Sequence, residues 1–269
     1  MLWTWGVSLY KMRVPEEITQ RTPAWSKDDL HSDPHHVGDK SKRVEQMFTA
    51  IARKYDLNNR LHSLWQDQVW RQRAVKMANL TGDEDVVDVA CGTGDLAMAF
   101  CTAGVKSVIG VDFTQAMLEI AVNKAAIADL PIEFRQGDAM HLDLPDCSAD
   151  VVSIAFGIRN VQDPETALAE FYRILRPSGK LVVLEFSTPQ NGLIRALNNF
   201  YTKKIMPLTA TLIAQDTSGA YKYLPKSVET FSNPTQLAQA IKKVGFQDIT
   251  QQQESFGVCT ISVANKYVT

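Results

Sequence analysis

Five short runs of apolar and β-branched residues alternate with helical stretches through the middle of this chain, and this alternation constrains the fold more than any other feature. The runs are VVDVA (86–90), SVIGVDF (107–113), IEFRQGD (132–138), ADVVSIAF (149–156) and KLVVLEF (180–186). Each run is apolar enough to be buried on both faces, as strands of a parallel sheet are. Helices are expected between them at 95–103, 114–126 and 163–175. Right-handed connections of this kind build a doubly wound α/β sheet.

The flanking segments complete the predicted architecture. From Ser41 apolar residues recur at intervals of three and four, which predicts N-terminal helices. A mostly helical insertion is expected over about 187–232, and a further helix at 234–244. The last two strands, FQDITQQQES and GVCTISVANK, are joined by a very short turn and predict an antiparallel hairpin at the sheet edge. We therefore expect a seven-stranded, mostly parallel sheet with a terminal antiparallel hairpin.

Composition is that of one compact domain with an extension. The 269 residues include 45% hydrophobic and 22% charged residues, which is ordinary for a globular protein. Residues 1–40 combine three prolines with many charges and no apolar period, so a flexible N-terminal extension is expected ahead of a domain at 41–269. The formal charge of -2 arises from 28 basic and 30 acidic residues without single-sign blocks. Nucleic acid is therefore not an expected partner.

The pattern favours neither a metal site nor a membrane-spanning helix. The four cysteines form no CxxC pair, and the histidines near the N-terminus lack a second ligand cluster, so no metal is expected. No run of about eighteen apolar residues is present that could span a bilayer. The basic residues of the first stretch follow its apolar patch instead of preceding it, unlike those of a signal peptide. These features favour a cytoplasmic location, where free cysteines stay reduced.

The segment VVDVACGTGDL, 86–96, runs from a strand into a glycine turn and then into a helix. Gly92 and Gly94 let the backbone pass close to a ligand where a Cβ would collide, and the helix that follows offers free N–H groups. By itself, the segment also fits an ordinary tight turn between a strand and a helix.

Asp112 strengthens the interpretation of a nucleotide site, because it ends the next strand, twenty residues after Gly92. A carboxylate there can accept both hydroxyls of a ribose, which NAD and S-adenosylmethionine share. The turn lacks a third glycine and carries Asp95 where a pyrophosphate would lie, so two negative groups would repel. The sulfonium and ammonium groups of S-adenosylmethionine instead suit Asp88 and Asp95. The sequence therefore favours S-adenosylmethionine over the alternative, an NAD-dependent oxidoreductase.

The third strand ends in Gly137-Asp138-Ala139. Asp138 can accept from the adenine amino group, while Ala139 supplies a backbone N–H and Met140 covers the ring. Asp138 alone would also fit a helix cap or a turn. Acids at the ends of three successive strands together favour a cofactor site.

With these residues in view, the chain resembles the ubiquinone/menaquinone biosynthesis C-methyltransferases over roughly residues 39–266. The shared stretches are DKSKRVEQMFTAIARKYDLNNRL, VDVACGTGD, QGDAMHLDLPDCSADVVSIAFGIRNV, ALAEFYRILRPSGKLVVLEFSTP, YKYLPKSVETF and VGFQDI. The glycine turn is common to many methyltransferases, whereas FGIRNV, the YD segment with Asn59 and YxYLPxS are particular to this family. The resemblance implies the Rossmann-like fold of class I methyltransferases, S-adenosylmethionine as methyl donor, and an activity similar to that of demethylmenaquinone methyltransferase.

The resemblance also implies cofactor contacts. The matching motifs place them on Thr93, Asp112, Asp138 and Ala139. Many family members have a serine just before FG, but this chain has Ala155, which leaves only a backbone interaction there. Some members carry an acid after the asparagine of the YD segment, where this chain has Arg60, and this looks closer to the menaquinone branch.

Methylation of a ring carbon needs a carbon nucleophile, and a quinone ring gains that character only as its quinol, when loss of a phenolic proton pushes charge onto the ring. Arg159 and Asn160 of FGIRN follow the fourth strand, where a fixed cation can hold a phenolate, and this resembles the active centre proposed for the family. Arg159 could instead pair with a carboxylate such as Asp163. Tyr55 of the N-terminal helices can orient the ring or serve as a core aromatic.

The stretch LIRALNNFYTKKIMPLTATLIA, 193–214, is an apolar part of the helical insertion and carries Lys203 and Lys204. It can form a lid that grips a prenyl chain at a membrane surface, or else helix core or a homodimer face. The first interpretation predicts transient, peripheral association with the inner face of the plasma membrane.

The predicted function is C-methylation of demethylmenaquinol to menaquinol, with a prenylated quinol as the partner molecule. Three further alternatives stay open. They are methylation of a 2-methoxy-polyprenyl-benzoquinol in ubiquinone synthesis, methylation of a soluble phenol or amine on the same fold, and a non-catalytic role in a quinone-synthesis complex. Asp56 and His62 are weak candidates for the general base.

Overall fold

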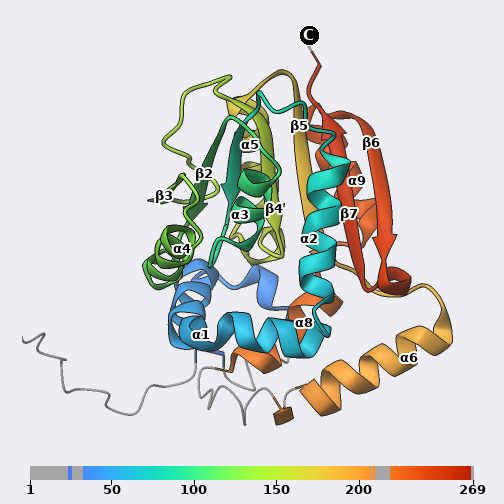
Figure 1. The fold of residues 1–269 in the computed structure, drawn as a ribbon. Helices are drawn as coiled ribbons and strands as arrows, with labels where there is room; N and C mark the ends of the chain where they lie inside the picture. Colours follow the sequence, from blue (N-terminus) through green and yellow to red (C-terminus); the bar gives the residue numbers. More distant parts are fainter. Residues whose placement is uncertain (1–23, 26–32, 207, 210–218, 268–269) are drawn as a thin grey trace, which may run out of the picture.

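The computed structural model describes residues 24–25, 33–206, 208–209 and 219–267. Within these ranges the strands form one sheet in the order β3-β2-β1-β4-β5-β7-β6 (Figure 1). Its first five strands run parallel, and β7 pairs antiparallel with both β5 and β6, which confirms the predicted sheet. The strands are β1 (Asp85–Val89), β2 (Ser107–Asp112), β3 (Ile132–Gln136), β4 (Ala149–Ala155), β5 (Leu175–Phe186), β6 (Gln247–Glu254) and β7 (Cys259–Asn265).

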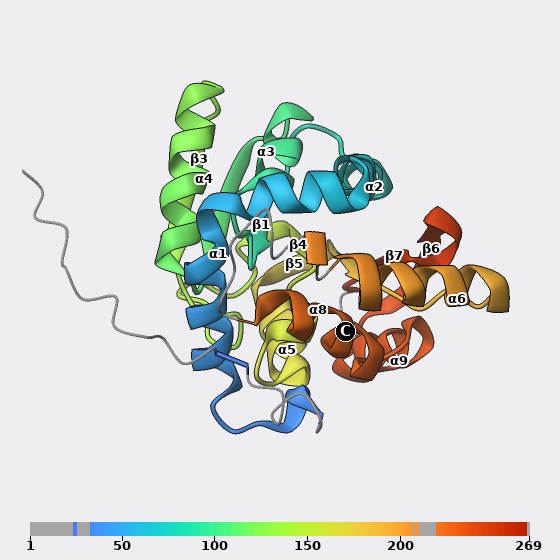
Figure 2. The same ribbon diagram turned by 90° about the horizontal axis from the view of Figure 1, so that it is seen from below.

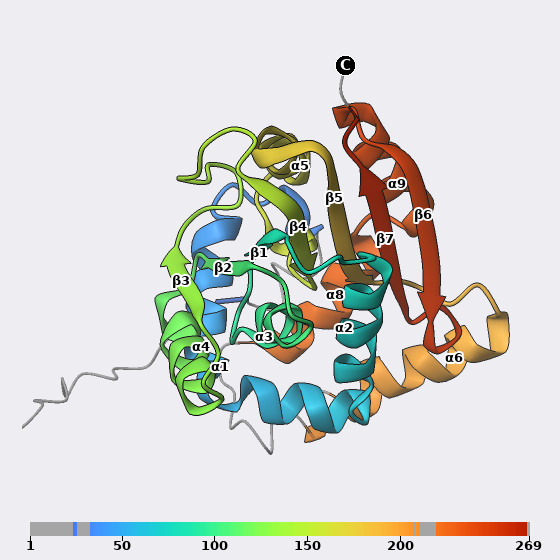
Figure 3. The same cartoon turned by 45° about the horizontal axis from the view of Figure 1, so that its top comes forward.

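Helices cover both faces of the sheet. Figure 3 shows α2 and α3 in front of the strands and α5 and α9 behind them. Trp70 and Phe100 pack on the first face, and Leu168 and Ile241 pack on the second. The helices are α1 (Lys40–Ser63), α2 (Gln66–Met77), α3 (Asp95–Thr102), α4 (Gln115–Ile127), α5 (Pro164–Ile174), α6 (Gly192–Phe200), α8 (Ala220–Thr230) and α9 (Pro234–Val244).

The central strands are buried because helices cover both faces of the sheet. Val86 and Val87 of β1 are neighbours in sequence but belong to two separate apolar clusters, one on each face. The edge strand β3 differs, since Glu133 and Arg135 are exposed and form an ion pair of 2.7 Å. The prediction that all five runs are buried on both faces is therefore wrong for β3, because one face of this edge strand is open to solvent.

The first forty residues differ in part from the expected flexible extension. Trp25 is 2% exposed, and its ring stacks on Tyr223 with centroids 4.5 Å apart. A short 3-10 helix, η1 (Pro34–His36), lies against α8, and His35 Nε2 lies 2.9 Å from the carbonyl oxygen of Ser227. These aromatic groups bury apolar area against the domain. Residues 1–23 and 26–32 lie outside the described part of the chain.

The carboxyl ends of the parallel strands lie beneath a helical layer. Seen from that end, α1, α8 and α6 run across the sheet (Figure 2). The 3-10 turn η2 (Ile158–Asn160) follows β4, and the π-helical turn η3 (Tyr201–Ile205) continues α6. The expected insertion over 187–232 thus contains α6, η3 and α8, while residues 207 and 210–218 lie outside the described ranges. Among the described residues, no helix combines the length and hydropathy needed to cross a bilayer.

Candidate active site

Two neighbouring cavities lie where the strands end. The smaller, of about 100 Å³, is lined by the ends of β1, β2 and β4, the turn after β3, the start of α4, and α1 between residues 41 and 55; we call it the strand-end cavity. The larger, of about 390 Å³, is lined by α1, α2, α6, η2, η3 and α8; we call it the helix-lined cavity. Four side chains line both, so the two cavities meet at Phe48, Tyr55, Phe156 and Asn160.

Two carboxylates line the strand-end cavity, as expected for acids that follow neighbouring parallel strands. Asp112 accepts hydrogen bonds from the backbone N–H groups of Gly92 at 2.7 Å and Thr114 at 2.8 Å. Burial raises the pKa of the Asp112 carboxyl, and these two bonds oppose that shift. Asp138 accepts from the N–H of Met140 at 2.9 Å. The backbone can pass close to a ligand at Gly92, where φ is +56° and a Cβ would meet no atom within 4 Å.

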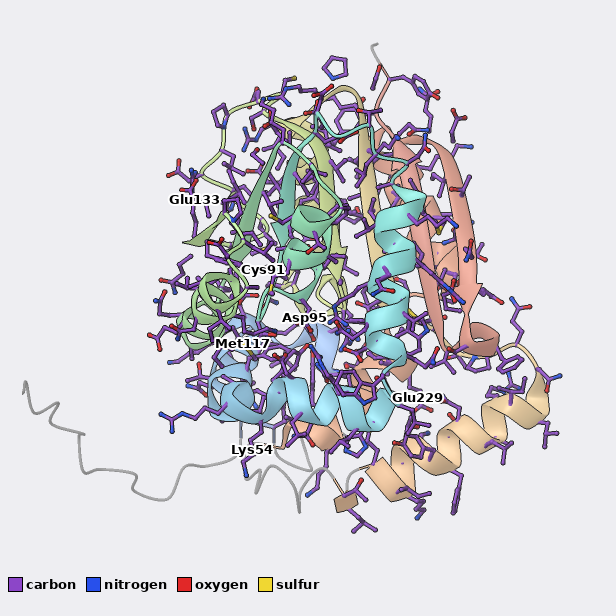
Figure 4. All side chains as sticks on the ribbon, in the orientation of Figure 1. Lys54, Cys91, Asp95, Met117, Glu133 and Glu229 are labelled. Atoms are coloured by element: carbon purple, nitrogen blue, oxygen red, sulfur yellow. The ribbon has the colours of Figure 1, made fainter. Side chains whose placement is uncertain are left out.

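The other lining residues of this cavity include several that the sequence singles out. Ala139, Met140 and Ala155 all border it. Met117 of α4, labelled in Figure 4, also lines this cavity. The strand-end cavity therefore combines acidic groups, backbone and apolar side chains, which is the mixture that a nucleoside requires.

Three predicted cofactor residues lie behind the wall of this cavity rather than on it. Asp88 is 1% exposed inside β1 and accepts a hydrogen bond from Ser153 Oγ at 2.7 Å on the neighbouring strand. Thr93 is turned towards α1, and its hydroxyl donates to Asp56 at 2.6 Å. Gly94 lies against the side chain of Phe134. The sequence shows that these residues are near the turn but does not show which way each side chain points.

An ion network beneath the glycine turn engages Asp95, whose label in Figure 4 lies at the start of α3. Its carboxylate lies 2.9 Å from Arg60 and 2.6 Å from Lys124. Although burial opposes it, the neighbouring cations lower the pKa of Asp95 to about 2. Lys124 also forms an ion pair with Asp56, with a nitrogen–oxygen distance of 2.7 Å. Asp95 and Asp56 are thus both paired with cations in this network, and the expectation that Asp95 favours the sulfonium stays a prediction.

Arg159 lines the helix-lined cavity from η2. It is 4% exposed and donates through Nη1 to Glu185 Oε1 and to the Phe156 carbonyl, each at 2.6 Å. Burial raises the pKa of the Glu185 carboxyl, while the guanidinium opposes the shift. Asp163 does not pair with Arg159, since it caps α5 by accepting from the N–H of Glu165 at 3.0 Å.

Asn160 and Tyr55 stand at the junction of the two cavities. The Asn160 amide donates to the Phe156 carbonyl at 3.1 Å and accepts from the Tyr223 hydroxyl at 3.0 Å, so both ends of the amide are fixed. Tyr55 packs edge-on to Phe48 with centroids 5.9 Å apart. Burial raises the pKa of the Tyr55 phenol, and the nearby guanidiniums of Arg71 and Arg159 oppose this.

Glu185 and Arg71 are site residues that the sequence reasoning missed. Arg71, on α2, is 6% exposed, lines the helix-lined cavity, and donates to the Asp67 carboxylate at 3.1 Å. Its Cζ lies 5.3 Å from the Phe156 ring centre, and the Cζ of Arg159 lies 5.3 Å from that of Phe186. The signal for Glu185 was present, because it is the one acid in the otherwise apolar run LVVLEF, 181–186. No comparable signal marks Arg71, which is one of several arginines on helices.

The model of the ubiE/COQ5 methyltransferase family matches residues 36–266, nearly the whole described chain. The chain belongs to this family. A demethylmenaquinone methyltransferase from Deinococcus radiodurans is 40% identical over 229 residues, covering 85% of this chain and 94% of the relative. Another from Thermus thermophilus is 42% identical, covering 82% and 100%. A ubiquinone/menaquinone biosynthesis C-methyltransferase UbiE from Geobacter sulfurreducens is 37% identical, covering 86% and 91%.

Solved structures agree on the fold. A SAM-dependent methyltransferase, described as a possible histamine N-methyltransferase, from Thermotoga maritima superposes with a TM-score of 0.58 at 20% identity, covering 83% of this chain and 99% of that one. A phosphoethanolamine N-methyltransferase 2 from Haemonchus contortus in complex with S-adenosyl-L-methionine gives 0.56 at 16% identity, covering 76% and 53%. The Rossmann-like methyltransferase fold is confirmed, and family membership confirms an S-adenosylmethionine-dependent methyltransferase over the NAD-dependent alternative.

A buried acid in this ubiE/COQ5 family member makes stability depend on pH. Burial raises the pKa of Asp88 from 3.8 to about 7, and its Oδ2 has no hydrogen-bond partner. Because the folded pKa lies above the unfolded one, stability is fully present below the unfolded pKa and falls as pH rises through the folded pKa. Between about pH 5.5 and 8.5 the wild type should lose about 2 kcal/mol of unfolding free energy that Asp88→Asn does not lose.

Urea unfolding of both proteins at the two pH values measures this difference directly. The exposed Asp143, changed to asparagine, serves as the control and should follow the wild type. Identical pH dependence of Asp88→Asn and the wild type would show that the folded pKa of Asp88 is not raised, and that this carboxyl is better solvated than its burial indicates.

Proposed function

We propose that this chain methylates a ring carbon of a reduced prenylated naphthoquinone, converting demethylmenaquinol to menaquinol with S-adenosylmethionine as the methyl donor. The observation that carries the proposal is the meeting of the two cavities at Tyr55, Phe156 and Asn160. Acids suited to a nucleoside line one side of this junction, and an apolar cavity with two buried guanidiniums lies on the other. The relatives named demethylmenaquinone methyltransferase support the naphthoquinone over the benzoquinone and over a soluble phenol or amine.

The polar groups that line the strand-end cavity match those of S-adenosylmethionine. Asp112 would hold the ribose hydroxyls, and Asp138 with the Ala139 N–H would hold the adenine edge. Gly92 at positive φ leaves room where a side chain would stand. When bound, S-adenosylmethionine supplies an electrophilic methyl group. The chain itself positions that group by holding the nucleoside against the end of the sheet.

Asp112→Ala is expected to weaken binding of S-adenosylmethionine by about 1.5 to 3 kcal/mol, because the ribose loses hydrogen bonds to a charged acceptor. Isothermal titration calorimetry measures the affinity, and circular dichroism checks the fold, since Asp112 also orders the backbone at Gly92 and Thr114. Asp143→Ala, at an exposed acid, is the matched control. Unchanged affinity in a folded Asp112→Ala protein would remove this residue from the cofactor site.

The helix-lined cavity suits the ring of a quinol. Ring methylation requires a deprotonated neighbouring oxygen, and the ring carbon then loses its own proton so that aromaticity returns. Arg159 and Arg71 can stabilise the negative charge on ring oxygens, and burial makes each cation more effective than it would be in water. Glu185 pairs with the buried Arg159 and offsets part of the cost of removing the guanidinium from water, so that the cation is held in place at the cavity. Asn160 and Tyr55 would orient the ring at the junction.

Quinone profiling of cells that lack the gene tests the proposed function. We expect demethylmenaquinone to accumulate, lighter than menaquinone by one methylene unit, and to disappear when the gene is restored. Mass spectrometry of extracted lipids identifies the compound. Accumulation of a demethylated benzoquinone would instead favour ubiquinone synthesis, and an unchanged quinone pool would contradict the proposal.

A cytoplasmic location with peripheral, transient association with the inner face of the plasma membrane belongs to the same proposal. A prenylated quinol dissolves in the bilayer, so an enzyme that methylates it must reach the membrane surface. The homodimer expected as an alternative use of the apolar insertion stays a prediction.

A further inference from the structure

The polar and apolar faces of helix α6 are reversed relative to those of an ordinary surface helix, whose apolar side chains face the core. Its polar side chains face inward and line the helix-lined cavity through Arg195, Asn198 and Asn199. Its large apolar side chains point outward, and Leu193, Leu197 and Phe200 are 72%, 62% and 60% exposed. These three positions lie at i, i+4 and i+7, on one stripe of the helix. A surface helix that buries nothing apolar of its own is expected to have an apolar partner.

More exposed apolar residues lie on the elements at the same end of the molecule. Figures 1 and 2 show α1, α6 and the turn between β6 and β7 gathered at the end where the parallel strands finish. These elements, with the turn between α1 and α2 and with η3, carry most of the large exposed apolar side chains among the described residues, namely Leu57, Leu61, Leu64, Trp65, Leu193, Leu197, Phe200, Ile205 and Phe256. One end of the molecule is therefore both apolar and adjacent to the helix-lined cavity.

The positive charge of α6 and η3 favours an anionic partner. The stretch Gly192–Ile205, which forms α6 and η3, contains three basic residues, Arg195, Lys203 and Lys204, and no acid. Lys203 is paired with Glu229 at 3.0 Å, whereas Lys204 is exposed. Basic groups beside an apolar stripe complement anionic lipid headgroups. In a twofold dimer through this face, the same cations would meet one another and repel.

We propose that the outer face of α6 docks this chain onto the surface of an anionic bilayer. The inference rests on the proposed function for its purpose, because docking there places the helix-lined cavity one helix away from the lipid in which a prenylated quinol resides. Leu193, Leu197 and Phe200 enter the headgroup region, and Lys204 contacts the lipid phosphates. The ring can then enter the cavity while the prenyl chain stays in apolar surroundings.

Vesicle co-sedimentation of the full chain tests this inference. With vesicles of phosphatidylcholine and phosphatidylglycerol we expect binding that weakens at high salt and is poorer with phosphatidylcholine alone. The double variant Leu197→Gln/Phe200→Gln should lose about tenfold or more in vesicle affinity, since two apolar anchors no longer leave water. The matched control is Val122→Gln/Ile127→Gln on α4, whose side chains are 50% and 88% exposed at the opposite edge of the sheet. It should bind as the wild type does.

Two results would overturn the docking surface. One is vesicle binding that is absent, or equal in the α6 variant and the wild type. The other is light scattering that shows a dimer in the wild type and a monomer in the α6 variant without a change in vesicle binding, which would make the face a contact between copies. Methylation of a water-soluble short-chain quinol should be unchanged in the α6 variant, because neither residue lines the cavity. If the wild type lacks that activity, the proposed function fails independently of the vesicle result.

Discussion

Arg159→Met is expected to lower the single-turnover rate of methyl transfer by about a hundredfold or more, the scale of losing one preorganised electrostatic partner. Affinity for S-adenosylmethionine should stay almost unchanged, because Arg159 borders the helix-lined cavity and not the strand-end cavity. Methionine keeps much of the length of the side chain and removes its charge. Rapid-quench kinetics with labelled S-adenosylmethionine measure the rate, and calorimetry measures the affinity.

Loss of Arg159 also leaves Glu185 buried without its cation, so a fall in activity could come from unfolding. The double variant Arg159→Met/Glu185→Leu controls for this, since an apolar pair can replace a buried ion pair with little loss of stability. We expect it to recover thermal stability and to remain as slow as the single variant. Recovery of the rate together with stability would assign Arg159 a purely structural role.

The sheet could be predicted because burial on both faces leaves a plain signal in the sequence. Apolar runs separated by helices identified β1, β2, β4 and most of β5, and the short turn identified the terminal hairpin. The extra length of β5 was not predicted, because RPSG at 176–179 has the composition of a turn. The ladder with β4 shifts register there, and a Cβ at Gly179 would lie 2.8 Å from the Arg176 carbonyl oxygen. Only glycine is tolerated at such a close approach.

The candidate site was predictable where topology alone decides the position of a residue. Asp112 and Asp138 follow strands that end at one edge of the sheet, so their place on the strand-end cavity follows from strand order. The surroundings of Asp88 could not be predicted in the same way, because its hydrogen-bond partner Ser153 lies on the neighbouring strand β4, 65 residues away in sequence. Arg71 was missed for a related reason, since nothing local to α2 shows that the helix faces η2 across a cavity.

The packing of the N-terminal segment could not be predicted from the sequence for a different reason. Prolines and charges around residues 15–36 give the composition of a flexible segment, and a single tryptophan leaves no period. Trp25 nevertheless stacks on Tyr223, whose hydroxyl donates to Asn160 in the site. One buried aromatic can thus connect the N-terminal segment to the site without any pattern in the surrounding sequence.

Dependence on the redox state of the ring tests the central claim most directly, because only the reduced ring is a carbon nucleophile. Methyl transfer from labelled S-adenosylmethionine to a short-chain demethylated naphthoquinone would be measured under strictly anaerobic conditions, with and without a chemical reductant. Mass spectrometry of the product locates the methyl group. We expect ring-methylated product with the reductant and none without it. Equal rates with the oxidised ring, or a methyl group on oxygen, would contradict it.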